Sequence, residues 1–212
     1  MVTIDIISSS FEGEFTERGA GEVKVAEGWH PWWHESDTRP EYKAATGAID
    51  EHRIYEGSKA QQWFNTYATH TAGIYQQVTG LEAGRDLHFH AFVQAFTRND
   101  DSNWRVSEGR YRMRIGVDPY GGTDAESEDV VWSVTVQPYD DYVPVVVETT
   151  TRSDRCTLFV WGQAEWALKH NNAYVDAVTL LYDDDLPPPP PPGPGGVTEE
   201  RVRELIEEYH GW

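Results

Sequence analysis

The segment from residue 28 to residue 43, GWHPWWHESDTRPEYK, places aromatic rings next to planar polar groups. A sugar presents a flat patch of C–H bonds and a rim of hydroxyls, so proteins bind sugars through a ring face and nearby hydrogen-bonding groups. No period of two or 3.6 residues organises the segment, which predicts a loop. Its candidate ligand-binding side chains are Trp32, Trp33, His34, Arg39, Glu41 and Tyr42.

Packing is the competing interpretation of these rings, because a loop rich in tryptophan can also cap one end of a β-sandwich. We expect Trp29, which follows Gly28, to be a core residue. For Trp32 and Trp33 both interpretations stay open. Exposed rings would stack on a ligand, whereas buried rings would stabilise the fold.

Several predicted strands show one face that mixes rings with hydrogen-bonding groups. In LHFHAFVQAF, residues 87–96, His88 and His90 alternate with apolar residues that form a core face. The same alternation places Arg112 and Trp161 on the mixed faces of two later strands, which makes all four candidates for ligand binding. A sheet with such a face either lines a wet groove or lies under a second layer of protein.

Catalytic motifs are absent from the sequence. With 36 acidic residues, pairs of carboxylates suited to glycoside hydrolysis arise by chance and carry no information. No GxSxG, HExxH or phosphate-binding loop is present. Four histidines, His30, His34, His88 and His90, offer a possible zinc site, but paired histidines on a ring-rich strand face favour a hydrogen-bonding surface. We therefore expect no enzymatic activity.

The candidate residues need strands to position them, and period-two alternation organises residues 1–186. Long amphipathic helical stripes and βαβ alternation are absent, so the pattern predicts an all-β fold, a two-sheet jelly-roll β-sandwich. The predicted strands span residues 60–67, 73–78, 87–96, 110–117, 129–136, 143–151, 156–163 and 173–182.

The composition argues against several classes of partner. A net charge of −19 disfavours the phosphate backbone of nucleic acids, so we expect no nucleic-acid partner. The chain lacks the long apolar stretch of about 18 residues that membrane insertion requires. The single cysteine, Cys156, allows no internal disulfide and is expected to be a buried strand residue. The first ten residues, MVTIDIISSS, lack the features of a secretory signal.

The composition changes sharply after Leu186. Residues 187–196, PPPPPPGPGG, predict a stiff polyproline II spacer of roughly 20 Å with a glycine hinge, and an unstructured tail is the alternative. Residues 197–212 predict a short helix that Thr198 caps. Such a helix is too short to be stable alone in water, so we expect it to dock on a larger assembly, another copy or the domain 1–186. Its apolar stripe is Val202, Leu205, Ile206 and Tyr209.

Four segments, in this order, carry a family resemblance: SSSFEGEF, GSKAQQW, GIYQQVTGLEAGRDLHFHAFVQA and NNAYVDAVTLLY. Over roughly residues 3–182 the chain resembles the galactose-binding-like jelly roll of carbohydrate-binding modules, in particular the group of families 4, 9 and 22. The resemblance implies two sheets, non-catalytic binding of a glycan or polysaccharide on a concave sheet or at loop tips, and a structural calcium ion.

In that family a glutamate of the first motif, an aspartate of the last strand and backbone oxygens hold the calcium ion, Ca2+. The matching positions here are Glu12, Asp176, Ser10, Ser58 and Lys59. Calcium takes six to eight oxygen ligands and can join distant segments. The alternative is that Glu12 and Asp176 are ordinary turn and edge residues. Because the segments around residues 28–43 and 118–129 depart from the family pattern, the resemblance assigns no sugar-binding residues.

We therefore expect a non-catalytic domain, similar to a carbohydrate-binding module, that residues 197–212 tether to a larger protein assembly. The alternative is a structural or decoration protein of a virion or extracellular filament that reuses the jelly roll without binding glycans. Either function predicts adhesion or assembly at an extracellular surface or on a virion particle, without a recognisable signal peptide.

Overall fold

The computed structural model describes residues 4–182, so the predicted spacer 187–196 and helix 197–212 lie outside the described residues. Within the described part, no helix has the length and apolar character that crossing a membrane requires. The elements are β1 (Phe15–Glu17), β2 (Lys24–Ala26), β3 (His30–Trp33), β4 (Glu41–Thr46), the 3-10 helix η1 (Glu51–Arg53), β5 (Lys59–Asn65), β6 (His70–Thr79), β7 (Asp86–Arg98), β8 (Tyr111–Asp118), β9 (Val131–Trp132), β10 (Val143–Thr150), β11 (Arg155–Ala164) and β12 (His170–Tyr182).

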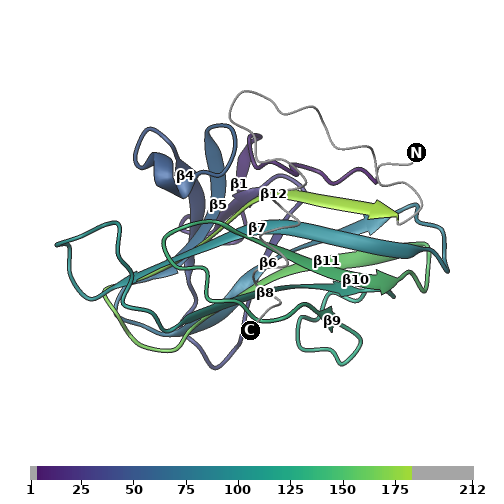
Figure 1. Cartoon of the computed structure of the whole chain (residues 1–212). Helices are drawn as coiled ribbons and strands as arrows, with labels where there is room; N and C mark the ends of the chain where they lie inside the picture. Colours follow the sequence, from purple (N-terminus) through teal and green to yellow (C-terminus); the bar gives the residue numbers. More distant parts are fainter. Residues whose placement is uncertain (1–3, 183–212) are drawn as a thin grey trace, which may run out of the picture.

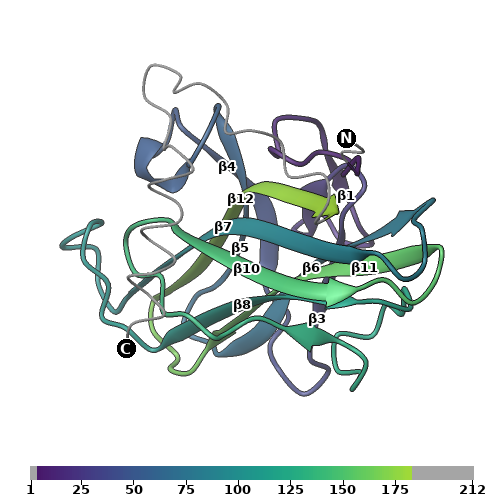
Figure 2. The same ribbon diagram turned by 45° about the vertical axis from the view of Figure 1, so that its right-hand side comes forward.

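The strands form two five-stranded antiparallel sheets that pack face to face. We call the sheet β10-β7-β12-β5-β4 the first sheet and the sheet β3-β6-β11-β8-β9 the second sheet. Figures 1 and 2 show β7, β10 and β12 crossing one layer and β6, β8 and β11 crossing the other. A small ribbon of β1 and β2 completes the fold. The predicted all-β two-sheet sandwich is confirmed.

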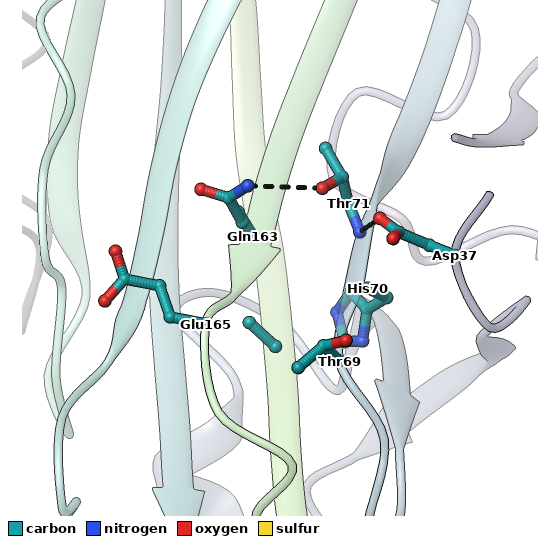
Figure 3. Close-up of a pocket in the computed structure, with 7 residues that line it drawn as sticks. Asp37, Thr69, His70, Thr71, Gln163 and Glu165 are labelled. Carbon is teal, nitrogen blue, oxygen red and sulfur yellow. Dashed lines mark hydrogen bonds between the residues drawn. The ribbon is translucent and has the colours of Figure 1, made fainter. Parts of the chain in front are cut away.

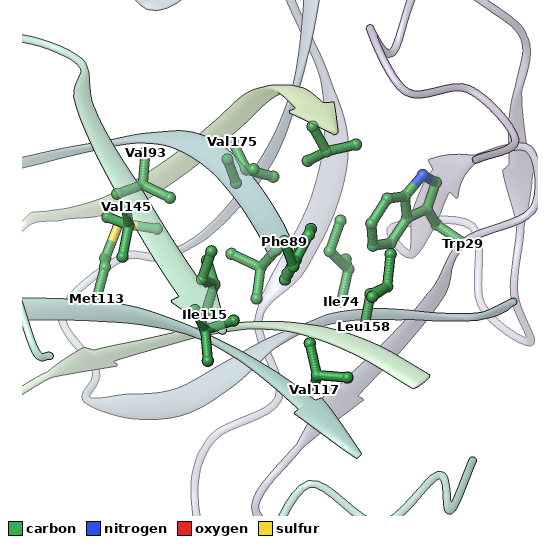
Figure 4. Packing of buried hydrophobic residues seen from close by; sticks show 14 of the residues in the cluster. Trp29, Ile74, Phe89, Val93, Met113, Ile115, Val117, Val145, Leu158 and Val175 are labelled. Atoms are coloured by element: carbon green, nitrogen blue, oxygen red, sulfur yellow. The ribbon is translucent and has the colours of Figure 1, made fainter. Parts of the chain in front are cut away.

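The core fills the space between the two sheets, as the alternation in β7 predicts. Leu87, Phe89 and Val93 face inward and have no exposed surface. Side chains of the second sheet, among them Ile115 and Leu158, meet them there (Figure 4). Burying each such side chain stabilises the fold by about 1.5–3 kcal/mol. The apolar positions that alternate along β7 are therefore the residues that it contributes to the core.

Trp29 and Cys156 occupy the interior positions expected of them. Trp29 has no exposed surface, and its indole Nε1 donates a hydrogen bond to the Ile7 carbonyl over 3.1 Å. Cys156 is also fully buried, and this burial raises the pKa of its thiol to about 12. The thiol therefore stays protonated near neutral pH, in agreement with a packing role.

The segment predicted to be a loop contains two strands, which corrects that expectation. His30–Trp33 form β3, the edge strand that pairs with β6, and Glu41–Thr46 form β4, which pairs with β5. Pro31 fits an edge strand because an edge position needs no ladder hydrogen bond from its nitrogen. Aromatic residues also favour the pleated surface of a sheet. Pairing with a distant strand thus overrides the missing local period.

The run 129–136 is mostly irregular, where a full strand was predicted. Val131 and Trp132 pair with β8 as β9, and Val136 forms an isolated bridge with Met113 of β8. Between these positions, Ser133 exchanges hydrogen bonds with Ile115, since its N–H donates to the Ile115 carbonyl over 2.9 Å and its hydroxyl accepts the Ile115 N–H over 3.1 Å. The hydroxyl thus takes the place of a backbone carbonyl and interrupts the ladder.

Candidate functional site

The solvent-facing side of the first sheet carries polar and aromatic residues in register. In β5 Trp63 points into the core, so its neighbours Gln62 and Phe64 point outward. Their cross-strand partners on β12 are Tyr174 and Asn172. Residues directly opposite each other in two paired strands share a face. Rings and amides therefore lie side by side on this surface.

Two loops rise over that face, and Arg53 joins them to the sheet. The first loop connects β4 to β5 and contains η1; the second, residues 99–110, connects β7 to β8. The Arg53 guanidinium donates to Gln94 Oε1 over 3.1 Å and to the Trp104 carbonyl over 2.6 Å. It also pairs with Asp50 over 3.4 Å. Arg53 is 5% exposed, so this buried network fixes the position of both loops.

Sheet and loops enclose a cavity of about 650 Å³, which we call the outer-face groove. Trp104 is 49% exposed at its rim, and its ring centroid lies 5.8 Å from that of Phe96 and 4.8 Å from that of His170. The groove is lined by Lys43, Ala44, Ala45, Thr46, Ile49, Asp50, Arg53, Gln62, Phe64, Thr66, Trp104, Arg105, His170, Asn172 and Tyr174.

The groove combines ring faces with groups that donate and accept hydrogen bonds. The Lys43 ammonium lies 4.6 Å from the centroid of the Phe64 ring. Gln62 Nε2 donates to the Tyr174 hydroxyl over 3.3 Å, and burial raises the pKa of that phenol to about 12, so it keeps its proton. Together with Asn172 these groups suit a ligand that presents both apolar C–H faces and hydroxyls.

A second cavity, of about 420 Å³, lies at one end of the second sheet (Figure 3). Asp37 Oδ2 accepts the Thr71 N–H over 2.7 Å, and Gln163 Nε2 donates to Thr71 Oγ1 over 3.3 Å. His70 is buried, which lowers its pKa to about 3, so its imidazole is neutral at physiological pH. The cavity is polar and is lined by Asp37, Thr69, His70, Thr71, Gln163, Ala164 and Glu165.

Three of the predicted ligand-binding residues lie on the outer face of the second sheet. Trp32 and Trp161 both stand opposite Gly73, from strands on either side of it. Arg112 lies further along, opposite Gln163, and pairs with Glu165 at the second cavity. The structure thus brings Trp32, Trp161 and Arg112 together on a face separate from the outer-face groove.

The other predicted residues of the segment 28–43 are dispersed. Tyr42 is 1% exposed and donates its hydroxyl to the Trp32 carbonyl over 2.7 Å, so its ring is a core ring that no ligand can reach. Trp33 packs against Tyr42, with 6.5 Å between ring centroids. His34 contacts Glu126 over 3.1 Å, and Arg39 pairs with Glu22 over 3.3 Å at the surface.

Of these residues only Glu41 borders the outer-face groove. It stands opposite Phe64 in the pairing of β4 with β5, two positions from Lys43. Side chains two residues apart in a strand lie on the same face. Glu41 therefore places an exposed carboxylate beside the ring and the ammonium at this end of the groove.

His88 and His90 share the outer face of the first sheet but do not line the groove. Tyr55 stacks on Phe92 with 3.8 Å between ring centroids, and this stack separates the histidines from the groove. His88 Nδ1 lies 3.3 Å from Glu148 Oε1. Burial, followed by the neighbouring His88, lowers the pKa of His90 to about 4.

The residues assigned to calcium are engaged in hydrogen bonds. The Glu12 carboxylate accepts the backbone N–H groups of Ser58 and Lys59 over 2.8 and 2.7 Å and the Ser58 hydroxyl over 2.6 Å. The Lys59 ammonium donates to the carbonyls of Glu12 and Gly13, each over 3.0 Å. This cation occupies carbonyl oxygens of the kind that a calcium ion would use.

The Asp176 carboxylate of β12 is held in a similar way, by backbone N–H groups that include two from the loop before β5. Its buried carboxylate accepts the N–H groups of Tyr55 over 3.0 Å, Glu56 over 3.2 Å and Ala177 over 2.8 Å, while burial raises its pKa to about 7. Ser10 lies beside Ser9, whose carbonyl accepts the Val178 N–H.

Donor hydrogens, rather than free oxygens, therefore face these carboxylates. Residues 4–182 contain no cluster of three or more His, Cys, Asp or Glu side chains placed to hold a metal. Hydrogen bonds join the segment before β1, through Glu12, and the last strand β12, through Asp176, to the loop before β5. Calcium at these positions stays a prediction from the family resemblance.

The sequence analysis missed two of the rings that line the outer-face groove, Trp104 and Phe64. Trp104 lies in NDDSNWRVSEG, where a lone tryptophan in a strongly polar run is a signal of an exposed ring. Phe64 follows Trp63, and strand alternation requires one of two adjacent rings to face outward. Both signals are local, but neither shows that the two rings border the same cavity.

Comparison with known proteins shows similarity of fold. No protein-family model matches the chain, and no curated protein sequence is significantly similar to it. Among solved structures, Fisc, a Stig cyclase from Fischerella sp. TAU, matches with a TM-score of 0.55 and 14% identity over 86% of this chain and 98% of its own. TmCBM61, solved in complex with β-1,4-galactotriose, matches with a TM-score of 0.50 and 13% identity over 74% of this chain and 90% of its own.

A third similar structure is the enzymatically active domain of tailspike protein 4 from bacteriophage CBA120. It matches with a TM-score of 0.50 and 10% identity over 79% of this chain and 21% of its own. At such identities the likeness establishes the fold alone. The chain therefore has the β-sandwich fold of a carbohydrate-binding module, which a cyclase and a phage tailspike domain share.

Proposed function

We propose that this protein binds an oligosaccharide in the outer-face groove without catalysing a reaction. The observation that carries the proposal is the exposed Trp104 ring above a sheet surface with the half-buried Phe64 ring and with the amides of Gln62 and Asn172, which line the groove although each residue is only 7% exposed. Ring faces accept the C–H patches of a sugar, and amides bond its hydroxyls. The fold shared with TmCBM61, a structure solved with a galactose trisaccharide, supports the same conclusion.

The groups that line the groove favour binding over hydrolysis. Asp50 is the one carboxylate among the lining residues, and it is paired with Arg53. Glycoside hydrolysis needs two carboxyl groups about 5–10 Å apart across the scissile bond. The residues that line the groove therefore lack the pair that glycoside hydrolysis requires, which favours binding over this one reaction.

A glycan-array screen of the full chain tests the proposal, followed by calorimetry with the glycans that bind. Trp104→Ala should weaken binding about 5- to 100-fold, the scale of losing one ring stacked on a ligand. Trp166→Ala is the matched control, because Trp166 is 52% exposed and lies outside the groove. Equal affinities for wild type and both variants would reject the groove as the binding site.

The tether to an assembly and the location at an extracellular surface or on a virion are further parts of this proposal. Both rest on residues 187–212, which lie outside the described residues. Leu205→Asp places a charge in the predicted apolar stripe and should abolish assembly, measured as molar mass by light scattering. A mass that is unchanged by the substitution would argue against docking through residues 197–212.

A further inference from the structure

The outer-face groove differs in charge from the protein around it. The chain as a whole carries a net charge of −19. Three cationic side chains, Lys43, Arg53 and Arg105, line the groove, against the single carboxylate of Asp50. The imidazole of His170 also lines the groove. The groove is thus a local excess of positive charge on an acidic molecule.

Two of these cations have no carboxylate of their own. Arg53 is 5% exposed and paired with Asp50, so it serves the loop network. Lys43 and Arg105 are exposed, and in the part of the chain that the structure describes neither forms an ion pair with a carboxylate. Lys43 lies over the Phe64 ring. Two positive groups at the groove therefore face solvent without an ion pair to any residue between 4 and 182.

The acids nearest the groove are mostly compensated. Asp100 accepts a hydrogen bond from Arg98 over 2.7 Å, and Asp101 pairs with Lys169 and, over 2.7 Å, with His170. Glu41 and Glu51 are the exceptions, because Glu41 is exposed beside Phe64 and Lys43 and Glu51 is exposed next to Asp50 in η1. Screening limits the influence of more distant acids to roughly 8–10 Å at physiological ionic strength. A ligand in the groove therefore experiences mainly Lys43 and Arg105, which line it, and the opposing carboxylates of Glu41 and Glu51 beside it.

We infer that the saccharide bound in the outer-face groove is acidic, with uronate carboxylates or sulfate esters that pair with Lys43 and Arg105. This inference rests on the proposed function and assigns its ligand class. The Arg105 guanidinium has the planar fork that matches a carboxylate or sulfate, and Lys43 supplies a point charge beside the ring that stacks on the sugar. The net charge of −19 repels polyanions from the molecule as a whole, so the cations of the groove favour their binding there.

Calorimetry with polygalacturonate oligomers and their carboxyl-reduced counterparts tests this inference on the full chain. The reduced oligomers keep the linkage and carry a neutral hydroxymethyl group in place of each carboxylate. The acidic form should bind about 10-fold tighter or more, the scale of one charge-assisted hydrogen bond, and this advantage should shrink in high salt. Chondroitin sulfate and its desulfated form, compared in the same way, distinguish sulfate from carboxylate recognition.

Single substitutions test whether Lys43 and Arg105 recognise the charge of the acidic oligomer. Lys43→Gln and Arg105→Gln should each weaken binding of the acidic oligomer about 10-fold and leave the reduced oligomer unaffected. Glu41→Gln should strengthen binding of the acidic oligomer, since it removes an opposing charge. Arg155→Gln is the control, because Arg155 is a surface cation on β11 of the second sheet, paired with Asp154 over 3.0 Å.

The outcomes separate this inference from the proposed function. Equal binding of acidic and reduced oligomers overturns the acidic ligand and leaves saccharide binding in the groove intact. Binding of acidic oligomers that Lys43→Gln and Arg105→Gln do not weaken also overturns it, because the charge would then be recognised elsewhere. Failure of every glycan on the array to bind overturns the proposed function together with this inference.

Discussion

The outer faces of the two sheets use aromatic residues in opposite ways. On the first sheet, loops hold the exposed Trp104 ring above a cavity of about 650 Å³. On the second sheet, rings lie flat on the strands, and a Cβ at Gly116 would come within 2.6 Å of the Trp132 ring. Glycine beneath a ring lets the ring pack directly on the backbone.

Cations show the same contrast between the faces. On the second sheet the Arg114 guanidinium lies between two rings, 4.1 Å from the centroid of Trp132 and 4.7 Å from that of Trp161. Above the first sheet, Arg105 of the loop 99–110 faces solvent without an ion pair among the described residues. An abundance of tryptophan therefore does not locate a binding surface. What matters is whether loops hold a ring away from the sheet and leave charges without partners.

The largest expected effect is on stability, from Trp32→Ala on the second sheet. Trp32 is half-buried against the position of Gly73, so truncation should lower the free energy of unfolding by about 3 kcal/mol. Denaturant melts measure this loss, and saccharide binding should stay within about twofold of wild type. An unchanged melt combined with lost binding would instead make Trp32 a sugar platform and reverse the contrast between the faces.

Phe64→Ala should have the opposite effect to Trp32→Ala, because it should mainly weaken saccharide binding rather than lower stability. The ring lies on the outer face beneath the Lys43 ammonium, so its loss should weaken saccharide binding by about 2 kcal/mol and change the melt less than Trp32→Ala does. Calorimetry and melts on the same protein samples provide both numbers. Phe64→Tyr, which keeps the ring, should retain binding, and its failure to do so would exclude ring stacking as the cause.

His90→Gln tests whether the outer face of the first sheet is shielded from solvent at His90, beyond the groove. Because the folded-state pKa of His90, about 4, lies below its ordinary value of 6.5, the neutral ring is favoured in the fold. The stability from this group is present above pH 6.5 and is lost as pH falls toward 4. The variant should therefore gain about 1–2 kcal/mol relative to wild type over this window.

The comparison must be made between variant and wild type at each pH. His70, with a pKa of about 3, adds a loss in the same direction, whereas the raised pKa of Asp176, about 7, contributes stability that is lost as pH rises from about 4 to 7. Both terms are common to the two proteins and cancel in the difference. Parallel stability curves would show that His90 is not desolvated, and would extend the accessible surface toward it.

The smallest expected effect is that of a chelator. Because the Lys59 ammonium already binds the carbonyls of Glu12 and Gly13, excess EDTA should leave the melting temperature unchanged, and Lys59→Ala should lower it slightly. A bound calcium ion would stabilise only the folded state, so EDTA would then lower the melting temperature. In that case Asp176→Ala should abolish the EDTA effect, and the family resemblance would extend to the metal site.

Local alternation in the sequence was sufficient to predict the sandwich. The core face of β7, with Leu87, Phe89 and Val93, follows from period two alone, because successive strand residues point to opposite faces. The burial of Cys156 was predicted from its place in a strand, whereas that of Trp29 was predicted from its place after Gly28. Edge strands such as β3 were missed, since their pairing depends on a partner far away in the chain.

The tertiary structure alone decided which polar and aromatic residues form a site. Lys43, Phe64, Trp104 and Asn172 come from four separate segments, and only strand register and the Arg53 network bring them to one groove. The cluster in residues 28–43 suggested a site by its proximity in sequence. Pairing of β3 with β6 and of β4 with β5 instead divides that segment between the two sheets, because a strand's position is determined by its partner rather than by its neighbours in the chain.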